Sequence, residues 1–364
     1  MSLMRKILLI SNGDSIHTIK WVEGLQKKYK IFLFDWRPIK NKNFNKMKNV
    51  TIVSPKINFN NKISILLFLK SFFTVNKKSN EILPDIIHAH YATSYGLLGV
   101  MAKNTALITS VWGTDITDFP HKSIFHMLIT KYILGHSDYI YCTSKFLSKK
   151  IKRITGKESS ITPFGILPHK EFSQTSLNNN NSIIFGTAKN LKKHSGLEDS
   201  LFCFAQIKKI NPNQKLKYFI AGNGPYKKKI MRFIRNLGIE NDVKFYGHLS
   251  HERMINFYKK INVYINIPSR ESFGVAVLEA AAAGLPSIVS NIGGLPEIVL
   301  HKETGLIVDR NDKNEIINAM NYFVNNKEEI KKIGLNAKSF VEEKYSWTDS
   351  LDIMNANYES IIDK

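Results

Sequence analysis

Two glutamates, Glu271 and Glu279, stand eight residues apart in the stretch ESFGVAVLE, with a Phe-Gly pair and a short apolar run between them. The chain has a formal net charge of +22, so acids at this spacing need a chemical reason. Gly274 lacks a Cβ and lets a ligand approach the backbone closely. The following VAVLEAAAAG favours a helix, whose first free N–H groups would bind a diphosphate. We therefore predict that phosphates lie between the two carboxylates.

The two acids are predicted to hold hydroxyl groups at opposite ends of one ligand, and not to act as a general acid and base. Glu279, about one turn into the helix, suits the vicinal hydroxyls of a ribose. Glu271, in the loop before the helix, would hold the hydroxyls of a sugar. Val275 and Ala276 would supply the N–H groups between them. A capped helix with acids in its first turns is the plain structural alternative.

The elements that position these residues alternate between strands and helices. The runs KILLI, KIFLFDW, DIIHAHY, LITSVWG and YIYCTS are apolar and end in polar or glycine residues, with helix-like segments between several of them. This alternation predicts a doubly wound α/β domain. A second alternation runs from IIFGTA through LKYFIAGNGP, VKFYGHL, VYINIP, LPSIVSN and GLIVD. Glu271 lies in the loop after VYINI, and open α/β sheets bind ligands at that end of a strand.

Length and composition suggest two domains. The chain has 364 residues, more than one ordinary core, and its 43% hydrophobic content excludes a disordered protein. The Asn-rich stretch EFSQTSLNNNNS has no periodicity and reads as a linker. We predict an N-terminal domain over 4–170, a linker over 171–182, a C-terminal domain over 183–345 and a final helix over 346–364.

The final segment is amphipathic. Its large apolar residues recur at helical spacing and form one stripe, made of Trp347, Leu351, Met354 and Tyr358. A stripe of this kind must pack against something. We expect the helix to return to the N-terminal domain and tie the two domains together.

Several features favour a reduced, cytoplasmic protein. The two cysteines, Cys142 and Cys203, lie far apart and have neither metal nor redox spacing. The apolar run near the N-terminus, ILLI, is too short for a secretory leader. The longest membrane-like stretch, ISILLFLKSFFTV, contains a lysine and is too short to span a bilayer.

The positive charge is concentrated in the first half of the chain. Residues 1–172 hold 26 Lys and Arg against 10 Asp and Glu, which predicts an anionic partner: nucleic acid, acidic lipid or a phosphate-bearing substrate. An AT-rich genome would also raise the lysine content. The segments ISILLFLKSFFTVNKK and HKSIFHMLITKYILGH mix large apolar residues with Lys or His, as helices on a membrane surface do. Burial of their apolar faces in the core is the alternative.

Taken together, these segments resemble a known family. ESFGVAVLEAAAAGLPSIVSNIGGLPEIV, with TGLIV beyond it, is similar to the donor-site signature of the family-4 retaining glycosyltransferases of the GT-B fold. Six other stretches agree in order, so the resemblance covers nearly the whole chain: ISNGDSIHTIKW, DIIHAHYATSYGLLG, SVWGTDI, ITPFGI, IAGNGP and VKFYGHL. It implies two doubly wound Rossmann-like domains facing across a cleft, with a C-terminal helix that crosses back to the N-terminal domain. The implied reaction moves a sugar from a nucleoside diphosphate with retention of configuration.

The resemblance also implies roles for single residues of the second domain. Glu271, Phe273 and Gly274 match the family's donor-sugar contacts, and Glu279 matches its ribose contact. Val275 and Ala276, at the helix start, would then face the diphosphate.

A basic pair of the family normally neutralises the leaving diphosphate, and TAKNLKKHSGLED is the matching stretch. Lys189 fits its first position. The second position falls on His194, and we predict that Lys193, one residue earlier, takes that role. A solvated lysine-rich face is the alternative for this stretch.

The resemblance is less complete in the first domain. Many members carry a histidine in the segment that matches SVWGTDI, and Trp112 stands at that position here. His90, at a strand end, and His17, in the first loop, are the remaining catalytic candidates, and Asp115 is a further candidate site residue. Gly13 matches the small residue that lets the first loop approach the phosphates. An aspartate follows it where the family often has a second glycine.

The expected partners follow from this site. They are a nucleotide sugar and a glycan or polyprenyl-diphosphate-linked acceptor of bacterial surface polysaccharide such as lipopolysaccharide or capsule. An anionic membrane surface, at the inner face of the cytoplasmic membrane, is a further expected partner. No Asp-x-Asp pair occurs in the sequence, and we expect no metal or other cofactor, because lysines and the helix end would stabilise the diphosphate.

Four rival functions stay open at this point. A nucleic-acid-binding protein is disfavoured because no binding module is recognisable. An epimerase or phosphorylase of similar fold would need a cofactor lysine or an acid pair that we do not find. An inactive nucleotide-binding protein of the GT-B fold and a transferase with a soluble small-molecule acceptor are the remaining alternatives.

Overall fold

The computed structural model describes residues 4–55, 64–166 and 182–364, and the chain forms two compact units. Unit 1 comprises Met1–Pro163 together with Thr348–Lys364, and unit 2 comprises Phe164–Trp347. The linker expected over 171–182 lies outside the described residues except for Ser182, which begins the first strand of unit 2.

Unit 1 is built on a seven-stranded sheet in the order β3-β2-β1-β4-β5-β6-β7, and all its neighbouring strands pair in parallel. Strands of a parallel sheet are buried on both faces and read as continuous apolar runs. The strands are β1 (Lys6–Ile10), β2 (Lys30–Phe34), β3 (Val50–Ile52), β4 (Ile86–His90), β5 (Ala106–Val111), β6 (Tyr139–Cys142) and β7 (Ser160–Ile161).

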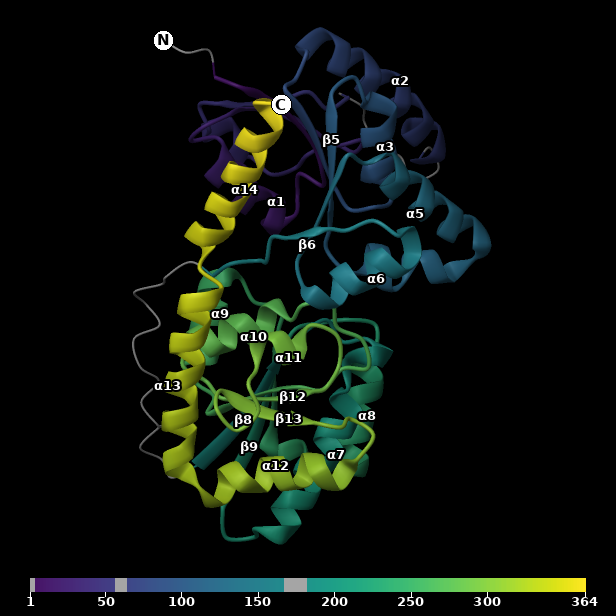
Figure 1. Cartoon of the computed structure of the whole chain (residues 1–364). Coiled ribbons are helices and arrows are strands. Elements are labelled where there is room, and N and C mark those ends of the chain that lie inside the picture. The colour runs from purple at the N-terminus through teal and green to yellow at the C-terminus, as the bar shows by residue number, and fades with distance from the viewer. Residues whose placement is uncertain (1–3, 56–63, 167–181) are drawn as a thin grey trace. The chain divides into compact units, whose positions relative to one another are not determined.

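Helices cover both faces of this sheet (Figure 1). They are α1 (Ile16–Leu25), α2 (Ser64–Ile82), α3 (Ser94–Ala102), α4 (Thr114–Thr117), α5 (Ile124–His136) and α6 (Lys145–Thr155), with short 3-10 turns η1 (Asn43–Lys46) and η2 (Phe119–Lys122). Alternate residues of a strand point to opposite faces, and β4 shows the result. Ile87 and Ala89 pack with α2 and α3. His88 points the other way, towards the C-terminal helix, where its Nδ1 lies 2.5 Å from the hydroxyl oxygen of Tyr358.

The C-terminal helix, α14 (Trp347–Ile362), belongs to unit 1 from Thr348 onwards. Met354 and Tyr358 are buried, and the side chain of Leu351 packs on Gly24 of α1, where an added Cβ would lie 2.8 Å from its Cδ1. The apolar stripe and the return to the N-terminal domain, both predicted from the sequence, are confirmed.

Unit 2 is built on a six-stranded sheet in the order β10-β9-β8-β11-β12-β13, again parallel throughout. The strands are β8 (Ser182–Ala188), β9 (Lys215–Ala221), β10 (Val243–Gly247), β11 (Val263–Asn266), β12 (Ser287–Ser290) and β13 (Gly305–Val308). The helices are α7 (Leu197–Ile210), α8 (Lys227–Asn236), α9 (His251–Tyr258), α10 (Val275–Ala282), α11 (Leu295–Ile298), α12 (Lys313–Asn325) and α13 (Lys327–Lys344), with 3-10 turns η3 (Lys193–Ser195) and η4 (Glu240–Asp242). The two α/β sheet domains predicted from the sequence are therefore both present.

The two segments that the sequence marks as membrane-surface helices correspond to α2 and α5. In α2, Val75 is buried in the core, and in α5 Ile133 and Leu134 are buried. Across the described ranges, no helix has the length and apolar character needed to cross a membrane.

Each sheet has one point at which the strand order reverses direction. In unit 1 this switch point lies between β1 and β4, and in unit 2 it lies between β8 and β11. The loops that leave the carboxyl ends of such a strand pair run in opposite directions and leave a crevice, where open α/β proteins bind their ligands. We therefore look for the functional residues at these two points.

Candidate active site

The switch point of unit 2 holds a half-buried lysine, Lys189. Lys189 directly follows β8, and its Nζ donates hydrogen bonds to Oδ1 of Asn266, at the end of β11, and to the carbonyl oxygen of Ser195, each at 2.7 Å. Burial lowers the pKa of Lys189 to about 8, whereas the nearby Glu271 carboxylate acts to raise it. Two uncharged oxygens thus hold the ammonium in place without neutralising its charge.

Two glycines hold the backbones of the charged residues in place. A Cβ at Gly222 would lie 1.9 Å from the carbonyl oxygen of Lys189, and a Cβ at Gly293 would lie 1.6 Å from that of Glu271. Both glycines also have positive φ, +123° and +65°, which other residues rarely adopt. Any side chain here would push the lysine or the glutamate out of position.

Helix α10 begins at the predicted diphosphate position. Gly274 caps it with φ +107° and offers no side chain to its first N–H groups. The first helical hydrogen bonds are donated by Val277 and Leu278 to the carbonyl oxygen of Gly274. The N–H groups of Val275 and Ala276 precede this hydrogen-bonded part, and both residues are partly exposed. This is the arrangement by which a helix start binds an anion.

Glu279 is fixed by a residue that the sequence analysis did not consider. Its Oε2 accepts a hydrogen bond of 3.0 Å from the hydroxyl of Tyr258, which ends α9. Burial and the neighbouring Glu279 charge raise the pKa of Tyr258 well above its ordinary value, so the hydroxyl stays protonated and donates. The carboxylate is held in one orientation and remains partly exposed.

Glu271 and Phe273 differ in exposure. Glu271 is partly exposed, and its Oε1 accepts the backbone N–H of Ser272 at 3.0 Å. Phe273 is buried and packs edge-on against Phe164 and Tyr345. The aromatic ring therefore anchors the loop, and the carboxylate two residues earlier is left accessible to a ligand.

The second basic position lies in the turn after Lys189. Lys193 and His194 begin η3 and are both exposed. The His194 carbonyl accepts the backbone N–H of Ser269 at 3.1 Å, and its Nδ1 lies 3.4 Å from the Ser269 hydroxyl oxygen. His194 is thus tied to the loop that leads to Glu271, whereas Lys193 is exposed.

The switch point of unit 1 contains a pocket of about 240 Å³. It is lined by hydroxyl, amide, imidazole and aromatic side chains, namely Ser11, Asn12, Ser15, His17, His90, Tyr91, Tyr95 and Trp112. Both histidine candidates therefore share one pocket. Trp112, which stands where many family members have a histidine, lies between them, 4.4 Å from the His90 ring centroid and 5.9 Å from that of His17.

Burial keeps these histidines uncharged. It lowers the pKa of His17 to about 4, assisted by Lys20, and places the pKa of His90 well below its ordinary value, assisted by His88 and His17. The Nδ1 of His90 lies 2.9 Å from the hydroxyl oxygen of Ser11. At neutral pH the pocket therefore offers neutral imidazoles that can accept a proton or a hydrogen bond.

Asp115 and Gly13 are both engaged in hydrogen bonds that involve backbone N–H groups. Asp115 is buried, and its carboxylate accepts the backbone N–H groups of Ala92 at 2.9 Å and Gly113 at 2.7 Å. Burial raises the pKa of Asp115, and these N–H donors oppose the rise. Gly13 donates its N–H to Oδ2 of Asp35 at 3.0 Å. Asp115 thus shapes the loop that carries Trp112 and does not line the pocket.

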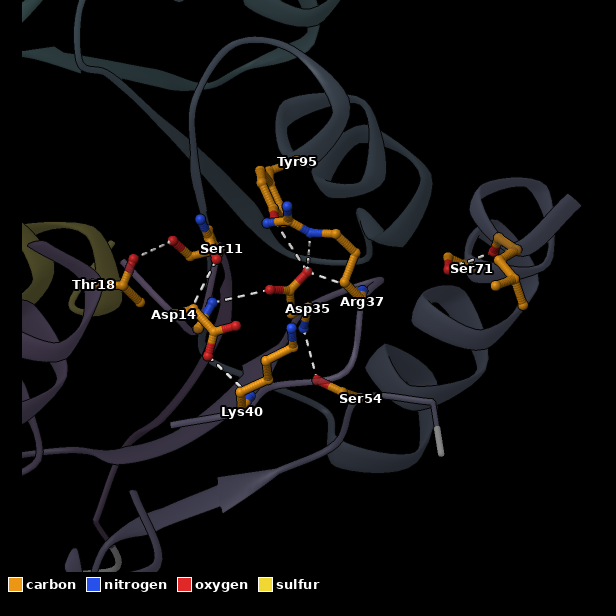
Figure 2. A network of polar contacts seen from close by, with 12 residues as sticks. Ser11, Asp14, Thr18, Asp35, Arg37, Lys40, Ser54, Ser71 and Tyr95 are labelled. Carbon is orange, nitrogen blue, oxygen red and sulfur yellow. Dashed lines mark hydrogen bonds and ion pairs between the residues drawn. The ribbon is translucent and has the colours of Figure 1, made fainter. Parts of the chain in front are cut away.

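Asp35 organises one wall of the same pocket, and the sequence analysis missed it (Figure 2). Its Oδ1 accepts the hydroxyl of Tyr95 at 3.0 Å and the backbone N–H of Arg37 at 3.0 Å. Arg37 in turn donates from a guanidinium nitrogen to the Tyr95 hydroxyl at 2.6 Å. A carboxylate after the buried strand β2 was the available signal, since this is where ligands of such sheets bind.

Asn266 carried the same signal, because it is a polar residue at the end of a buried strand. Tyr258 carried none, since its position on α9 relative to α10 depends on tertiary packing.

In the described parts of the chain, no three His, Cys, Asp or Glu side chains are grouped as metal ligands.

Comparisons with known proteins agree with this geometry. Residues 169–340 match the family model described as glycosyl transferases group 1, and residues 6–144 match the one described as glycosyl transferase 4-like. The chain is a family-4-like glycosyltransferase. Sequence relatives include the uncharacterized glycosyltransferase MJ1178 of Methanocaldococcus jannaschii, which is 28% identical and covers 96% of this chain and 95% of the relative. N-acetyl-alpha-D-glucosaminyl L-malate synthase of Bacillus anthracis is 25% identical over 72% of this chain and 71% of its own.

Solved structures show that this glycosyltransferase has the GT-B fold. The sucrose-phosphate synthase of Thermosynechococcus elongatus matches with a TM-score of 0.83 at 19% identity, over 98% of both chains. HepE of Anabaena, solved with UDP-glucose, matches with a TM-score of 0.79 at 17% identity, over 98% of this chain and 100% of its own. The lipopolysaccharide outer core galactosyltransferase WaaB matches with a TM-score of 0.74 at 18% identity, over 98% of this chain and 99% of its own.

Proposed function

We propose that this glycosyltransferase moves a sugar from a nucleoside-diphosphate sugar, with retention of configuration, to a glycan or lipid-linked glycan acceptor in bacterial surface polysaccharide synthesis. The observation that carries the donor assignment is the Lys189 ammonium, held between Asn266 and Ser195 at the switch point of unit 2. Solved neighbours bound to UDP and UDP-glucose support a donor of this class.

In this proposal the donor lies along unit 2. The diphosphate binds at the start of α10, where the Val275 and Ala276 N–H groups and the Lys189 charge meet it. The ribose hydroxyls bind Glu279, and the sugar hydroxyls bind Glu271. As the bond to the anomeric carbon breaks, negative charge grows on the diphosphate, and Lys189 with the helix start stabilises it. The reaction is proposed to need no metal or other cofactor.

The proposed acceptor is a glycan carried on a polyprenyl diphosphate. Support comes from the lipopolysaccharide galactosyltransferase among the structural neighbours and from the basic N-terminal half. A soluble acceptor is the second candidate, because one relative is named for transfer to L-malate. The proposed location is the cytoplasm, at the inner face of the membrane, which agrees with two buried free thiols, Cys142 and Cys203.

A thermal-shift screen of nucleoside diphosphates and their sugars tests the donor assignment. A ligand at one hundred times its Kd stabilises the protein by about 2.7 kcal/mol, so a true donor raises the Tm clearly. The Glu279→Gln variant should lose about half of the shift or more, whereas the control Glu342→Gln, on the exposed side of α13, should keep it. Absence of a shift with every nucleotide would overturn the donor proposal.

Release of nucleoside diphosphate then tests the acceptor. The wild-type enzyme is incubated with the identified donor and, in parallel, with lipid-linked glycan extracts and with L-malate. Acceleration by the lipid-linked fraction alone supports the first candidate, and acceleration by malate alone supports the second.

A further inference from the structure

Helix α5 is apolar on nearly all sides, yet only one side is covered. Thr130, Ile133 and Leu134 are buried in unit 1. The opposite side carries five exposed large apolar residues, with exposed fractions of 65% for Ile124, 71% for Phe125, 54% for Leu128, 37% for Ile129 and 46% for Tyr132. At about 100° per residue these five span an arc of roughly 140°. A helix that is apolar all round is normally buried on every side, whereas no described part of the chain covers this face of α5.

The rest of the molecule shows that this clustering is unusual. In the described part of unit 2, the exposed large apolar residues lie one each on four different helices, and they are Ile210, Met231, Tyr322 and Leu335. Single exposed apolar residues are ordinary, whereas contiguous groups mark interaction surfaces. In unit 1 the neighbouring helix α2 also exposes Leu66, Leu69 and Phe73. Both helices pack against α3, so they belong to one layer of unit 1 (Figure 1).

The charges around this face select the partner. Residues 119–137, which include all of α5, contain no Asp or Glu. Lys122, just before the helix, and Lys131, at the edge of the exposed arc, are both exposed. On α2, Lys70 and Lys77 accompany the exposed apolar residues, and Lys77 also pairs with the exposed Glu81 at 3.9 Å. On α5 the large apolar side chains are flanked by lysines, and the nearest acids in the sequence are Asp118 before the helix and Asp138 after it, which pairs with Lys103. Such a face matches a bilayer surface with anionic headgroups.

We propose that the exposed face of α5, defined by Ile124, Phe125, Leu128, Ile129 and Tyr132, docks unit 1 on an anionic lipid bilayer. The apolar side chains insert between headgroup and acyl chains, while Lys122 and Lys131 contact headgroup phosphates. The helix lies in the plane of the interface and does not cross it. The inference adds a partner to the proposed function, and it would bring the enzyme to the surface that holds a lipid-linked acceptor.

Flotation with vesicles tests the proposal. The full chain is mixed with phosphatidylcholine vesicles, with and without phosphatidylglycerol. We expect wild type to float with the anionic vesicles, and the Phe125→Glu, Leu128→Glu double variant to lose at least tenfold in partitioning. The matched control, Ile210→Glu on α7 with Met231→Glu on α8, introduces the same two charges at exposed apolar residues of unit 2 and should bind as wild type. Equal binding by the double variant, or no binding by wild type, overturns the proposal.

A charge variant measures the electrostatic part separately. Lys122→Gln with Lys131→Gln should weaken binding about fivefold per lysine, the ratio that corresponds to about 1 kcal/mol each. The exposed pair Lys209→Gln with Lys215→Gln, in unit 2, serves as its control. Binding to neutral and anionic vesicles alike, insensitive to all four lysines, would contradict the choice of an anionic surface.

Two further measurements distinguish membrane docking from self-association of the chain and from damage to the donor site. Light scattering after size exclusion reports whether α5 joins two copies of the chain, and a dimer that the double variant abolishes would overturn the membrane assignment. Thermal shifts with the identified nucleotide should be unchanged in the double variant, since none of its substituted residues belongs to the donor site. Loss of vesicle binding with intact nucleotide binding therefore supports the docking face whether or not the acceptor is lipid-linked.

Discussion

The two units have the same kind of crevice at the reversal of strand order, but they fill it with opposite chemistry. In unit 2 the crevice holds the charged Lys189, with Glu271 close enough to act on its pKa. In unit 1 it holds His17 and His90, whose pKa values burial lowers far enough to leave them neutral. Shared topology therefore fixes where a ligand binds, and the residues at the strand ends decide which part of a ligand each crevice suits.

The difference arises from the burial and the neighbours of each basic group. The Lys189 ammonium donates to two oxygens, so its charged form survives burial at neutral pH. Burial of His90 penalises its imidazolium form, and the neighbouring His88 and His17 lower its pKa further. A diphosphate needs positive charge, whereas a sugar hydroxyl needs a neutral hydrogen-bonding partner. Substitutions in the crevice of unit 2 and in that of unit 1 should therefore reduce the activity of the enzyme in different ways.

The largest expected effect comes from removing the charge of unit 2. Lys189→Met keeps the length of the side chain, and we expect kcat/KM for the donor to fall about 10²- to 10³-fold, as when a group that stabilises transition-state charge is lost. Lys217→Met is the control, because this lysine pairs with Asp242 at the far end of β9. Steady-state kinetics of both variants decide the matter, and equal losses would remove the special role of Lys189.

The two glutamates should divide the loss between binding and turnover. Glu279→Gln removes a charged partner of the ribose, and a hydrogen bond to a charged group contributes about 1.5–3 kcal/mol, so nucleotide affinity should fall roughly tenfold or more. Tyr258→Phe should give a smaller loss, because it frees the carboxylate without removing it. Glu271→Gln should mainly lower kcat. Calorimetric titration with the nucleotide checks the first pair, and an unchanged Kd in Glu279→Gln would contradict its ribose contact.

Much of this comparison could be predicted from the sequence, because parallel strands are short apolar runs whose polar terminal residues mark the crevice. Glu271 followed from that pattern and from the resemblance, whereas Lys189 followed from the resemblance alone. Tyr258 did not, since its hydrogen bond to Glu279 joins two helices whose packing no local pattern specifies. The membrane-like segments were ambiguous for a related reason. Periodicity shows that a helix has apolar residues, but only the fold shows that α5 leaves five of them exposed.

Acid should destabilise unit 1 before unit 2. Burial lowers the pKa of His88 to about 3 and that of His17 to about 4, both below 6.5 in the unfolded chain. The unfolded state therefore binds more protons below pH 6.5, and the free energy of unfolding falls as the pH falls, by roughly 1.4 kcal/mol per pH unit for each such histidine. Hydrogen exchange at pH 7 and pH 5 should show weaker protection of β4 and unchanged protection of β11. His88→Gln, which cannot titrate, should reduce the difference.

Raising the pH, in contrast, should lower activity through unit 2. The pKa of Lys189 is about 8 in the free protein, so its charge is lost as the pH rises through that value. Because the diphosphate binds the charged form, kcat/KM for the donor should decline above pH 8, about tenfold per unit once the lysine is neutral. Bound diphosphate raises this pKa, so the decline in kcat should begin at higher pH. A pH profile of the Lys189→Met variant that keeps the same decline would assign it to another group.

The smallest expected effect is at the exposed basic turn, and it decides which residue completes the basic pair. Lys193 is solvent-exposed, so its contribution to binding the diphosphate should be modest, about three- to tenfold in kcat/KM for Lys193→Ala, and should shrink at high salt because exposed charges are screened. Lys192→Ala, the exposed neighbour, should be nearly silent. His194→Ala should also be mild, since this residue contacts the Ser269 loop and its loss would be insensitive to salt. If Lys193→Ala is silent and His194→Ala carries the salt-dependent loss, the histidine is the second basic group. The crevice of unit 2 would then contain an imidazole of its own, as the crevice of unit 1 does.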